Sequence, residues 1–273
     1  MRKKDFKLNK IHYIILAVVL IIGIVVRIWG LGEKSLWIDE IYSWVFSSQK
    51  TFFGSFIYMF ADLSPPIYYL ILYVWIKLFG SSEFMLRFPS FLAGIASVFF
   101  IYFATKKVFN KQIALGAAIL TGLSPVMLYY SQEARPYSLF AMFSIITVSV
   151  WIEIINKIAK EDLDSKTLIK YVIFSLATIL THYWGLVLVF FQIIYLMIFC
   201  VEKKRNLKLI LTAAMRIFLI SGCFFICQYS FLKKYTYILN PMFSRIYISN
   251  PFHEIFKQIF YENYVFLLIV VMF

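Results

Sequence analysis

Two adjacent carboxylates, Asp39 and Glu40, lie shortly after the first long apolar segment of the chain, among aromatic residues. In a chain that is otherwise so apolar, acidic residues at the edge of a membrane segment need an explanation. A carboxylate there can act as a general base that takes the proton from an attacking hydroxyl group. Because neighbouring residues of a helix point about 100° apart, we expect one acid to face a cavity and the other to bond structurally. Capping of a helix N-terminus, where acids are favoured, is the competing explanation.

A second acid and several cations could complete such a site. Glu133 and Arg135 stand two residues apart, and His182 precedes two aromatic residues. Cations can steady a departing phosphate, since arginine suits bidentate phosphate contacts and lysine acts as a point charge. The candidates for that role are Arg135, His182, Lys233, Lys234 and Arg245.

Each of these residues also has a structural explanation. Glu133 and Arg135 could be the solvated charges of a loop, and His182 could be an interfacial anchor. The basic residues of 228–258 could hold anionic lipid headgroups without specificity. Asp39 and Glu133 could share a divalent metal ion, but two carboxylates are not a specific signal for a metal.

The composition excludes a soluble globular domain. Of the 273 residues, 62% are hydrophobic and 15% are charged, with a mean hydropathy of +0.81, whereas soluble domains average about 45–50% apolar and about 25% charged. We therefore predict an all-α, polytopic bundle of transmembrane helices. The net charge of +13 does not indicate nucleic-acid binding, because the Lys and Arg residues lie mainly in short loops between apolar segments, where they orient a membrane protein.

Apolar stretches of about 20 residues predict the membrane-spanning helices. The predicted spans are residues 11–29, 88–105, 112–130, 137–155, 168–184, 184–201, 209–231 and 260–273. Residues 30–87 are predicted to form the first extracytoplasmic loop with interfacial helices, and residues 228–258 a later outer loop. Arg216, inside one predicted span, is expected to snorkel at the membrane boundary.

The short apolar run 67–79 decides the topology of everything after it. If it crosses the membrane, the Lys-rich loops face outward; if it does not, they face the cytoplasm together with the basic N-terminus. Positive residues favour the cytoplasmic side, so we expect 67–79 to be a juxtamembrane or re-entrant helix and the N-terminus to be cytoplasmic. The same topology places the groups around Asp39, Glu133 and His182 together on the extracytoplasmic side.

Several short motifs occur in an order and at a spacing that resemble a known family. They are residues 36–42 (LWIDEIY), 65–69 (PPIYY), 79–90 (FGSSEFMLRFPS), 124–125 (SP), 132–137 (QEARPY) and 181–183 (THY). Each motif alone is weak. The ordered set is similar to the bacterial GT-C glycosyltransferases of the dolichyl-phosphate-mannose protein mannosyltransferase-like group, which are related to the lipid A aminoarabinose transferases. The resemblance covers about residues 11–184 well and the remainder loosely.

The resemblance implies a GT-C fold and inverting transfer from a polyprenyl-phosphate-linked sugar donor on the extracytoplasmic side of the cell membrane. It implies that Asp39 is the catalytic base with Glu40 beside it, and that Glu133 is the acid of the second outer loop. Some relatives hold a divalent metal ion near these acids and others do not. Members often carry His or Lys before the double proline, where this chain has Ser64. In those members the His or Lys is expected to contact the donor phosphate, and Ser64 does not supply that cation.

The acceptor could be a lipid, a glycan or a protein, since no feature of the sequence selects among them. Members of the family are usually longer, and the chain stops at Phe273 inside an apolar run. We therefore expect this sequence to hold the N-terminal, catalytic half of such a protein, truncated at that point. The alternatives are a truncated non-catalytic membrane protein that binds lipid or a partner, and a transporter. A transporter would show repeated halves and interrupted helices near the middle of the membrane, and the sequence shows no internal repeat.

Overall fold

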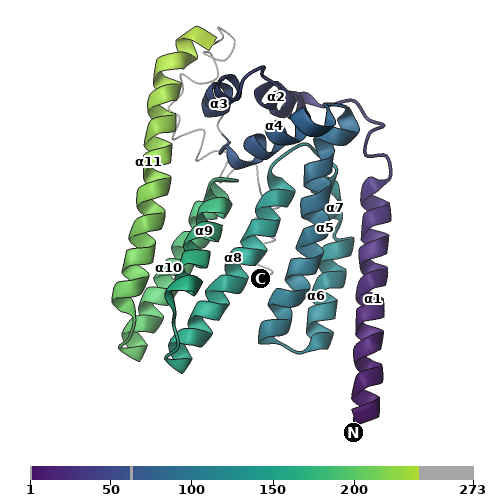
Figure 1. The fold of residues 1–273 in the computed structure, drawn as a ribbon, viewed down its shortest axis with the longest axis vertical. Helices are drawn as coiled ribbons and strands as arrows, with labels where there is room; N and C mark the ends of the chain where they lie inside the picture. The colour runs from purple at the N-terminus through teal and green to yellow at the C-terminus, as the bar shows by residue number, and fades with distance from the viewer. Residues whose placement is uncertain (1, 62–63, 240–273) are drawn as a thin grey trace.

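The computed structural model describes the backbone of residues 2–61 and 64–239, and within it the side chains of residues 13–59 and 64–230. This part of the chain contains eleven helices and no strand (Figure 1), which confirms the all-α prediction. The helices are α1 (Arg2–Ile28), α2 (Ile38–Ser47), α3 (Phe52–Ala61), α4 (Ile67–Phe79), α5 (Glu83–Val108), α6 (Lys111–Leu123), α7 (Pro125–Ser131), α8 (Tyr137–Lys160), α9 (Ser165–Ile179), α10 (Trp184–Lys203) and α11 (Leu207–Leu239).

Four helices of the described part are long and apolar enough to cross a membrane. They are α5, α8, α10 and the Leu207–Ser230 part of α11. Together α6 and α7 would make a fifth span, although they are bent by 54° at the break between them. The apolar part of α1, Tyr13–Ile28, and the helix α4 are shorter than the roughly 20 residues that a span needs. The chain is a multi-pass membrane protein.

The break between α6 and α7 is encoded by Ser124 and Pro125. The Ser124 hydroxyl accepts a hydrogen bond from the backbone N–H of Met127 at 3.4 Å, and Pro125 occupies the first turn of α7. Proline lacks the N–H that would continue α6, and its fixed φ suits the first position of a new helix. The chain therefore changes direction here, and α7 delivers residues 132–136 to one end of the bundle.

The helices α2, α3 and α4 lie across this end of the bundle (Figure 1). The bounds of α4 coincide with the predicted juxtamembrane segment 67–79. At about 1.5 Å per residue, its 13 residues extend over about 20 Å, less than a hydrocarbon core of about 30 Å. The side of the membrane that this end faces remains a prediction.

Buried aromatic side chains fasten these three helices to the bundle. The fully buried side chains Tyr68, Tyr69 and Leu72 of α4 belong to one core cluster with Phe46 of α2, Met59 of α3 and Leu86 of α5. Phe46 meets Tyr69 edge-on, with ring centroids 5.9 Å apart, and the Ser47 hydroxyl donates to the Tyr69 carbonyl at 3.1 Å. The helices of the first loop are therefore packed as a core, which can hold side chains in fixed positions.

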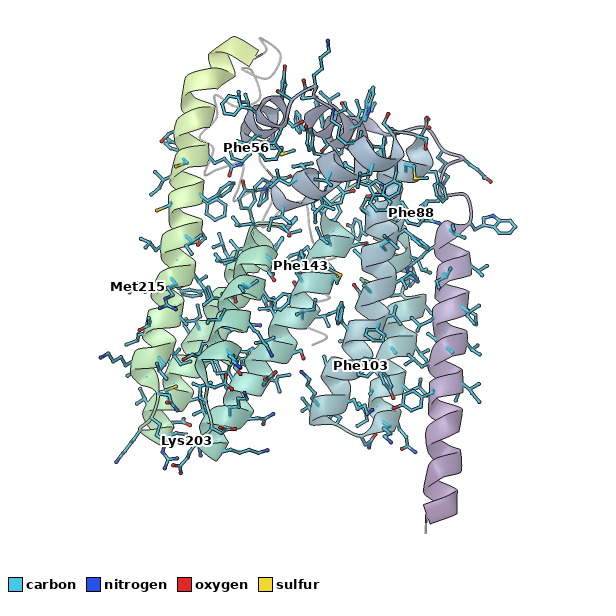
Figure 2. All side chains as sticks on the ribbon, viewed as in Figure 1. Phe56, Phe88, Phe103, Phe143, Lys203 and Met215 are labelled. Atoms are coloured by element: carbon cyan, nitrogen blue, oxygen red, sulfur yellow. The ribbon has the colours of Figure 1, made fainter. Side chains whose placement is uncertain are left out.

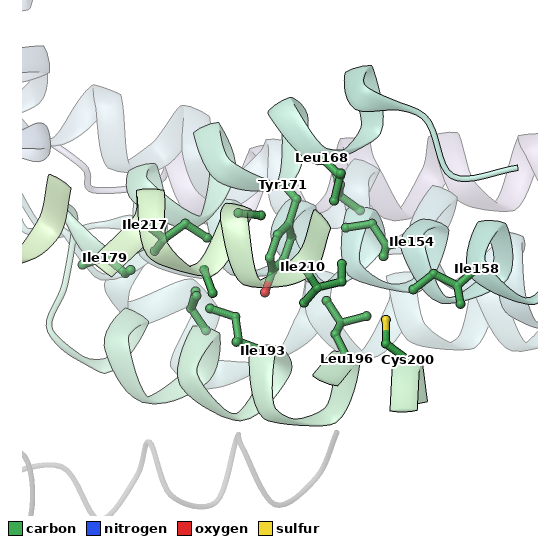
Figure 3. Close-up of a cluster of buried hydrophobic side chains, with 14 residues drawn as sticks. Ile154, Ile158, Leu168, Tyr171, Ile179, Ile193, Leu196, Cys200, Ile210 and Ile217 are labelled. Atoms are coloured by element: carbon green, nitrogen blue, oxygen red, sulfur yellow. The ribbon is translucent and has the colours of Figure 1, made fainter. Parts of the chain in front are cut away.

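Two further clusters hold the long helices together. One joins α8, α9, α10 and α11 around residues such as Tyr171 and Ile210 (Figure 3), and the other joins α1, α5 and α6. The outer faces remain apolar, as shown by Phe103 at 37% and Met215 at 64% exposure (Figure 2). Helices that are apolar on all sides suit a bundle surrounded by lipid.

Some observed bounds differ from the predicted spans. The helix α11 continues to Leu239, so the first residues of the predicted outer loop 228–258 are helical. The helix α9 has 15 residues, because the chain turns after Leu180 and does not continue to the predicted end at 184. The predicted span 260–273 lies outside the described residues. Arg216 is exposed on α11.

Candidate active site

A pocket of about 240 Å³ opens where α2, α8 and α10 begin and α7 ends. Its acidic and basic lining residues are Asp39, Glu133, Arg135 and His182. Its aromatic lining residues are Trp37, Tyr129, Tyr130, Tyr137, Tyr183 and Trp184. Three segments far apart in the sequence thus bring four of the predicted site residues to one pocket.

Asp39 is the member of the acid pair that faces the pocket. Its side chain is 37% exposed, and its Oδ2 lies 3.8 Å from Nη2 of Arg135. Nη1 of Arg135 also donates to the Asp39 backbone carbonyl at 3.4 Å. The carboxylate is open to a bound molecule and lies beside a cation, so it can accept a proton from a hydroxyl group held in the pocket.

Glu40 points the other way and does not line the pocket. It is fully buried (0% exposed) and accepts hydrogen bonds from Nε and Nη2 of Arg87, at 2.9 and 2.7 Å. It also accepts from the backbone N–H of Ala134 at 2.7 Å and from that of Trp37 at 3.3 Å. Glu40 therefore ties α2 to α5 and to the second loop. Its carboxylate is not available to a molecule bound in the pocket.

Arg87 is the partner that sequence reasoning did not assign. Besides its bidentate contact with Glu40, its Nη1 donates to the carbonyls of Leu31 and Lys34, at 2.9 and 2.8 Å. A fixed guanidinium fork suits this combination of a carboxylate and turn carbonyls. The sequence feature that could have identified Arg87 is its place as an arginine in the first turns of a long apolar helix.

Glu133 is nearly buried in the pocket wall, with 7% of its surface exposed. Its Oε2 has no hydrogen-bond partner among the described residues. Burial raises the pKa of this carboxyl group, and the charges of Glu40 and Asp39 add to the rise, while the Tyr129 hydroxyl and Arg135 oppose it. A buried acceptor without a partner is costly, so a bound molecule or ion that supplies one would be favoured here.

His182 lies between aromatic rings and is neutral. Its ring centroid lies 5.6 Å from that of Tyr137 and 5.1 Å from that of Phe140. Burial lowers its pKa to about 4, and Arg135 adds to this. The backbone N–H of Trp184 donates to Nδ1 at 3.3 Å. Nδ1 is therefore the acceptor of the ring, and Nε2 carries the proton as a donor.

The turn that carries His182 requires a glycine. A Cβ on Gly185 would lie 2.6 Å from the Thr178 carbonyl oxygen, closer than side chains approach backbone. The start of α10 can therefore pack directly on the end of α9, and this contact places His182 at the pocket.

The remaining predicted cations are not placed at the pocket. Lys233 and Lys234 belong to α11, but their side chains lie outside the described residues, as does the whole of Arg245. In the described part of the chain, no group of three or more His, Cys, Asp or Glu residues could hold a metal ion. The predicted metal site between Asp39 and Glu133 would have these two carboxylates as its protein ligands. Ser64 lines the pocket and brings no charge.

Comparison with known proteins identifies a family. The sequence model of the dolichyl-phosphate-mannose-protein mannosyltransferase family matches residues 64–226, which contain Glu133, Arg135 and His182 but begin after Asp39. No curated protein matches the chain, and no solved structure matches it. Because the matched range covers more than half of the 273 residues, the chain belongs to the dolichyl-phosphate-mannose-protein mannosyltransferase family of GT-C membrane glycosyltransferases.

Proposed function

We propose that this protein transfers a sugar from a polyprenyl-phosphate donor to a hydroxyl group of an extracytoplasmic acceptor, with inversion. The observation that carries the proposal is the position of Asp39, an exposed carboxylate in a pocket that also holds Arg135. Family membership supports the reaction class.

The residues of the pocket can take complementary parts in one displacement. Asp39 accepts the proton of the acceptor hydroxyl while its oxygen bonds to the anomeric carbon. The bond from that carbon to the phosphate oxygen breaks on the opposite face, and the phosphate leaves with the electron pair. Arg135 and the Nε2–H of His182 are the donors that can stabilise the leaving phosphate. The aromatic rings supply apolar walls for the sugar and lipid.

Glu40 is better suited to positioning than to proton transfer. It is buried in its ion pair with Arg87, so its carboxylate is not available to an acceptor. By holding α2, it fixes the direction of Asp39. We propose Asp39 as the base and assign Glu40 and Arg87 to the support of that residue.

Glu133 is proposed to bind either the acceptor or a divalent metal ion shared with Asp39. A metal ion in this place would neutralise charge that develops on the donor phosphate. Its requirement is tested by measuring transfer with and without EDTA and after adding Mg²⁺ or Mn²⁺. Loss of activity in EDTA and its recovery with metal would support a metal ion at Glu133. An unchanged rate in EDTA would support the alternative, that Glu133 binds the acceptor.

Replacement of Asp39 by asparagine tests the proposal. Asp39→Asn keeps the size of the side chain but removes its capacity to accept a proton, so kcat should fall by about 10²–10⁴-fold. Transfer is measured in proteoliposomes with radiolabelled polyprenyl-phosphate sugars, mannose first, and with lipid, glycan and peptide acceptors.

The matched control is Glu33→Gln, which neutralises an exposed acid of the same loop outside the pocket. This variant should transfer at the normal rate. Normal transfer by Asp39→Asn, with the protein inserted and folded, would contradict the assignment of the base.

A further inference from the structure

The first helix carries a charged side chain that the pocket does not use. Arg27 lies one residue before the end of α1 and is fully buried (0% exposed). Among the described residues, no carboxylate forms an ion pair with it. A guanidinium withdrawn from water is costly unless its N–H groups are hydrogen bonded. Its partners therefore indicate what it does.

Two of its partners are carbonyl groups at the end of another helix. Nη1 of Arg27 donates to the Gly122 carbonyl at 2.9 Å, and Nη2 donates to the Thr121 carbonyl at 3.5 Å. These residues are in the last turn of α6, where carbonyl groups have no partner within the helix. A cation is also favoured at this negative end of the helix dipole. Arg27 thus caps α6 at its break with α7.

A return contact comes from the second outer loop. The side-chain amide of Gln132 donates to the backbone carbonyls of Arg27 and Trp29, each at 3.0 Å. These carbonyls lie at the end of α1. Nε of Arg27 donates to the Ser131 hydroxyl oxygen at 3.1 Å. The ends of α1 and of the α6–α7 pair cap each other, and we call Arg27, Ser131 and Gln132 the clasp.

The backbone around the clasp leaves little room for another arrangement. A Cβ on Gly94 would lie 2.0 Å from the Ser131 hydroxyl oxygen and 3.2 Å from Nε of Arg27. A Cβ on Gly23 would lie 3.0 Å from Nη1 of Arg27. Gly94 therefore lets α5 approach the two buried side chains closely, and Gly23 leaves room for the guanidinium to lie back along α1, where Nη1 also donates to the Gly23 carbonyl at 3.2 Å.

Glu133 follows the clasp directly and is held by its neighbours. On its other side, Ala134 donates its N–H to Oε1 of Glu40 at 2.7 Å, and the Ser90 hydroxyl donates to the Arg135 carbonyl at 3.0 Å. The Oε2 atom of Glu133 has no hydrogen-bond partner among the described residues. The Tyr129 hydroxyl of α7 interacts with the carboxylate, and the backbone on either side fixes the rest of its position.

We propose that Arg27 and Gln132 are positioning residues that fix the Glu133 carboxylate in the pocket through the clasp. The inference rests on the proposed function, because it requires that Glu133 serves the transfer reaction. A displacement of about 1 Å can cost about 100-fold in rate. Loss of the clasp therefore lowers kcat.

Thiol labelling measures the position of residue 133 without an activity assay. Glu133→Cys is introduced into a chain whose three native cysteines are replaced by alanine, and its reaction rate with a maleimide is measured in lipid nanodiscs. Arg27→Met and Gln132→Leu should each raise this rate several-fold, because a residue that is 7% exposed is released. Gln132 lies outside the helices, so its variant serves if Arg27→Met does not insert.

Transfer is then measured in the chain with Glu133 intact. Both variants should lower kcat, and their effects should not add in the double variant, because each breaks the same clasp. Arg27→Lys keeps the charge and can reach one of the α6 carbonyls, so its kcat should be intermediate. The matched control is Arg216→Met, which removes an exposed arginine of α11 and should change neither labelling nor kcat.

The outcomes separate this inference from the proposed function. Unchanged labelling of residue 133 in both variants overturns the inference, whatever happens to transfer. Faster labelling with a normal kcat overturns it too, because the position of the carboxylate would then have no effect on the reaction. Faster labelling together with normal transfer by Asp39→Asn would confirm that the clasp positions residue 133. The same result would contradict the proposed function.

Discussion

Asp39 and Glu40 are neighbours in the chain but have different surroundings. The Asp39 side chain is 37% exposed, whereas that of Glu40 is 0% exposed. Consecutive residues of a helix point about 100° apart, and α2 lies across the end of the bundle. It therefore directs one acid into the pocket and the other toward Arg87. A substrate can reach only the first of the two carboxylates.

Glu133, and not His182, should set the acid limb of the pH–rate profile. Burial and the nearby carboxylates raise the pKa of Glu133, so its ionised form is lost on acidification at a higher pH than in a free glutamate. His182, with its pKa lowered to about 4 by burial, stays neutral in the same range. Activity that needs the Glu133 carboxylate should therefore fall as pH drops through its raised pKa. The profile of kcat/KM against pH for the wild type and His182→Gln checks this.

His182→Gln should lower the rate, because it removes a donor to the phosphate, but should leave the acid limb at the same pH. The residual activity of Glu133→Gln should lack that limb. A limb that disappears in His182→Gln would contradict the assignment and show that the histidine titrates.

At the scale of elements, Arg87 joins α5 to α2 and to the turn before it. Arg87→Ala would leave Glu40 buried without a cation, which costs about 3–5 kcal/mol for a buried pair that loses one partner. The midpoint of thermal unfolding in detergent should fall accordingly. The double variant Glu40→Leu with Arg87→Leu should lose less, because no buried charge is left unpaired.

Lys77→Ala is the matched control, because Lys77 is an exposed cation of α4. Its midpoint should stay at the wild-type value. If the unfolding midpoint of Arg87→Ala is no lower than that of Lys77→Ala, the ion pair does not hold the first loop in place.

Apolar patterns could predict the helices, but not the contacts between them. The apolar run 67–79 is followed by Gly80, and α4 has the same bounds as the run. In contrast, the contact of Arg87 with Glu40 joins residues 47 positions apart, and that of Arg27 with Ser131 joins residues 104 apart. No local pattern encodes such pairs. A charge within an apolar run is a signal of function. The same signal marks Arg216, which is exposed, so it does not distinguish a buried arginine from an exposed one.

Part of the pocket was predictable for a different reason. Loops that follow helices of alternating direction alternate between the two ends of a bundle, so Asp39, Glu133 and His182 could be grouped from the order of apolar segments. Which atoms face the pocket depends on packing. The buried state of Glu133 and the ring contacts of His182 come from α7 and α8, and the sequence carries no local sign of them.

At the scale of the whole molecule, lysines gather at the end of the bundle away from the pocket, in the last turns of α5 (Lys106 and Lys107), α8 (Lys157 and Lys160) and α10 (Lys203). At the end away from the pocket, Lys107 and Lys157 each lie 3.7 Å from Glu153, and Lys157 also pairs with Asp164. Lys203 lies at the same end (Figure 2). Surface pairs of this kind add little stability, but an excess of lysine marks the cytoplasmic side of a membrane protein. The pocket should accordingly face the extracytoplasmic side.

Cysteine labelling in intact cells checks this orientation. Ser81 and Asn110 are exposed residues on either side of α5, a helix long enough to cross the membrane. In a chain without its native cysteines, Ser81→Cys should react with an impermeant maleimide from outside. Asn110→Cys should react only after the cells are permeabilised. The opposite pattern would place the pocket in the cytoplasm, away from an extracytoplasmic acceptor, and would contradict the proposed function together with the topology.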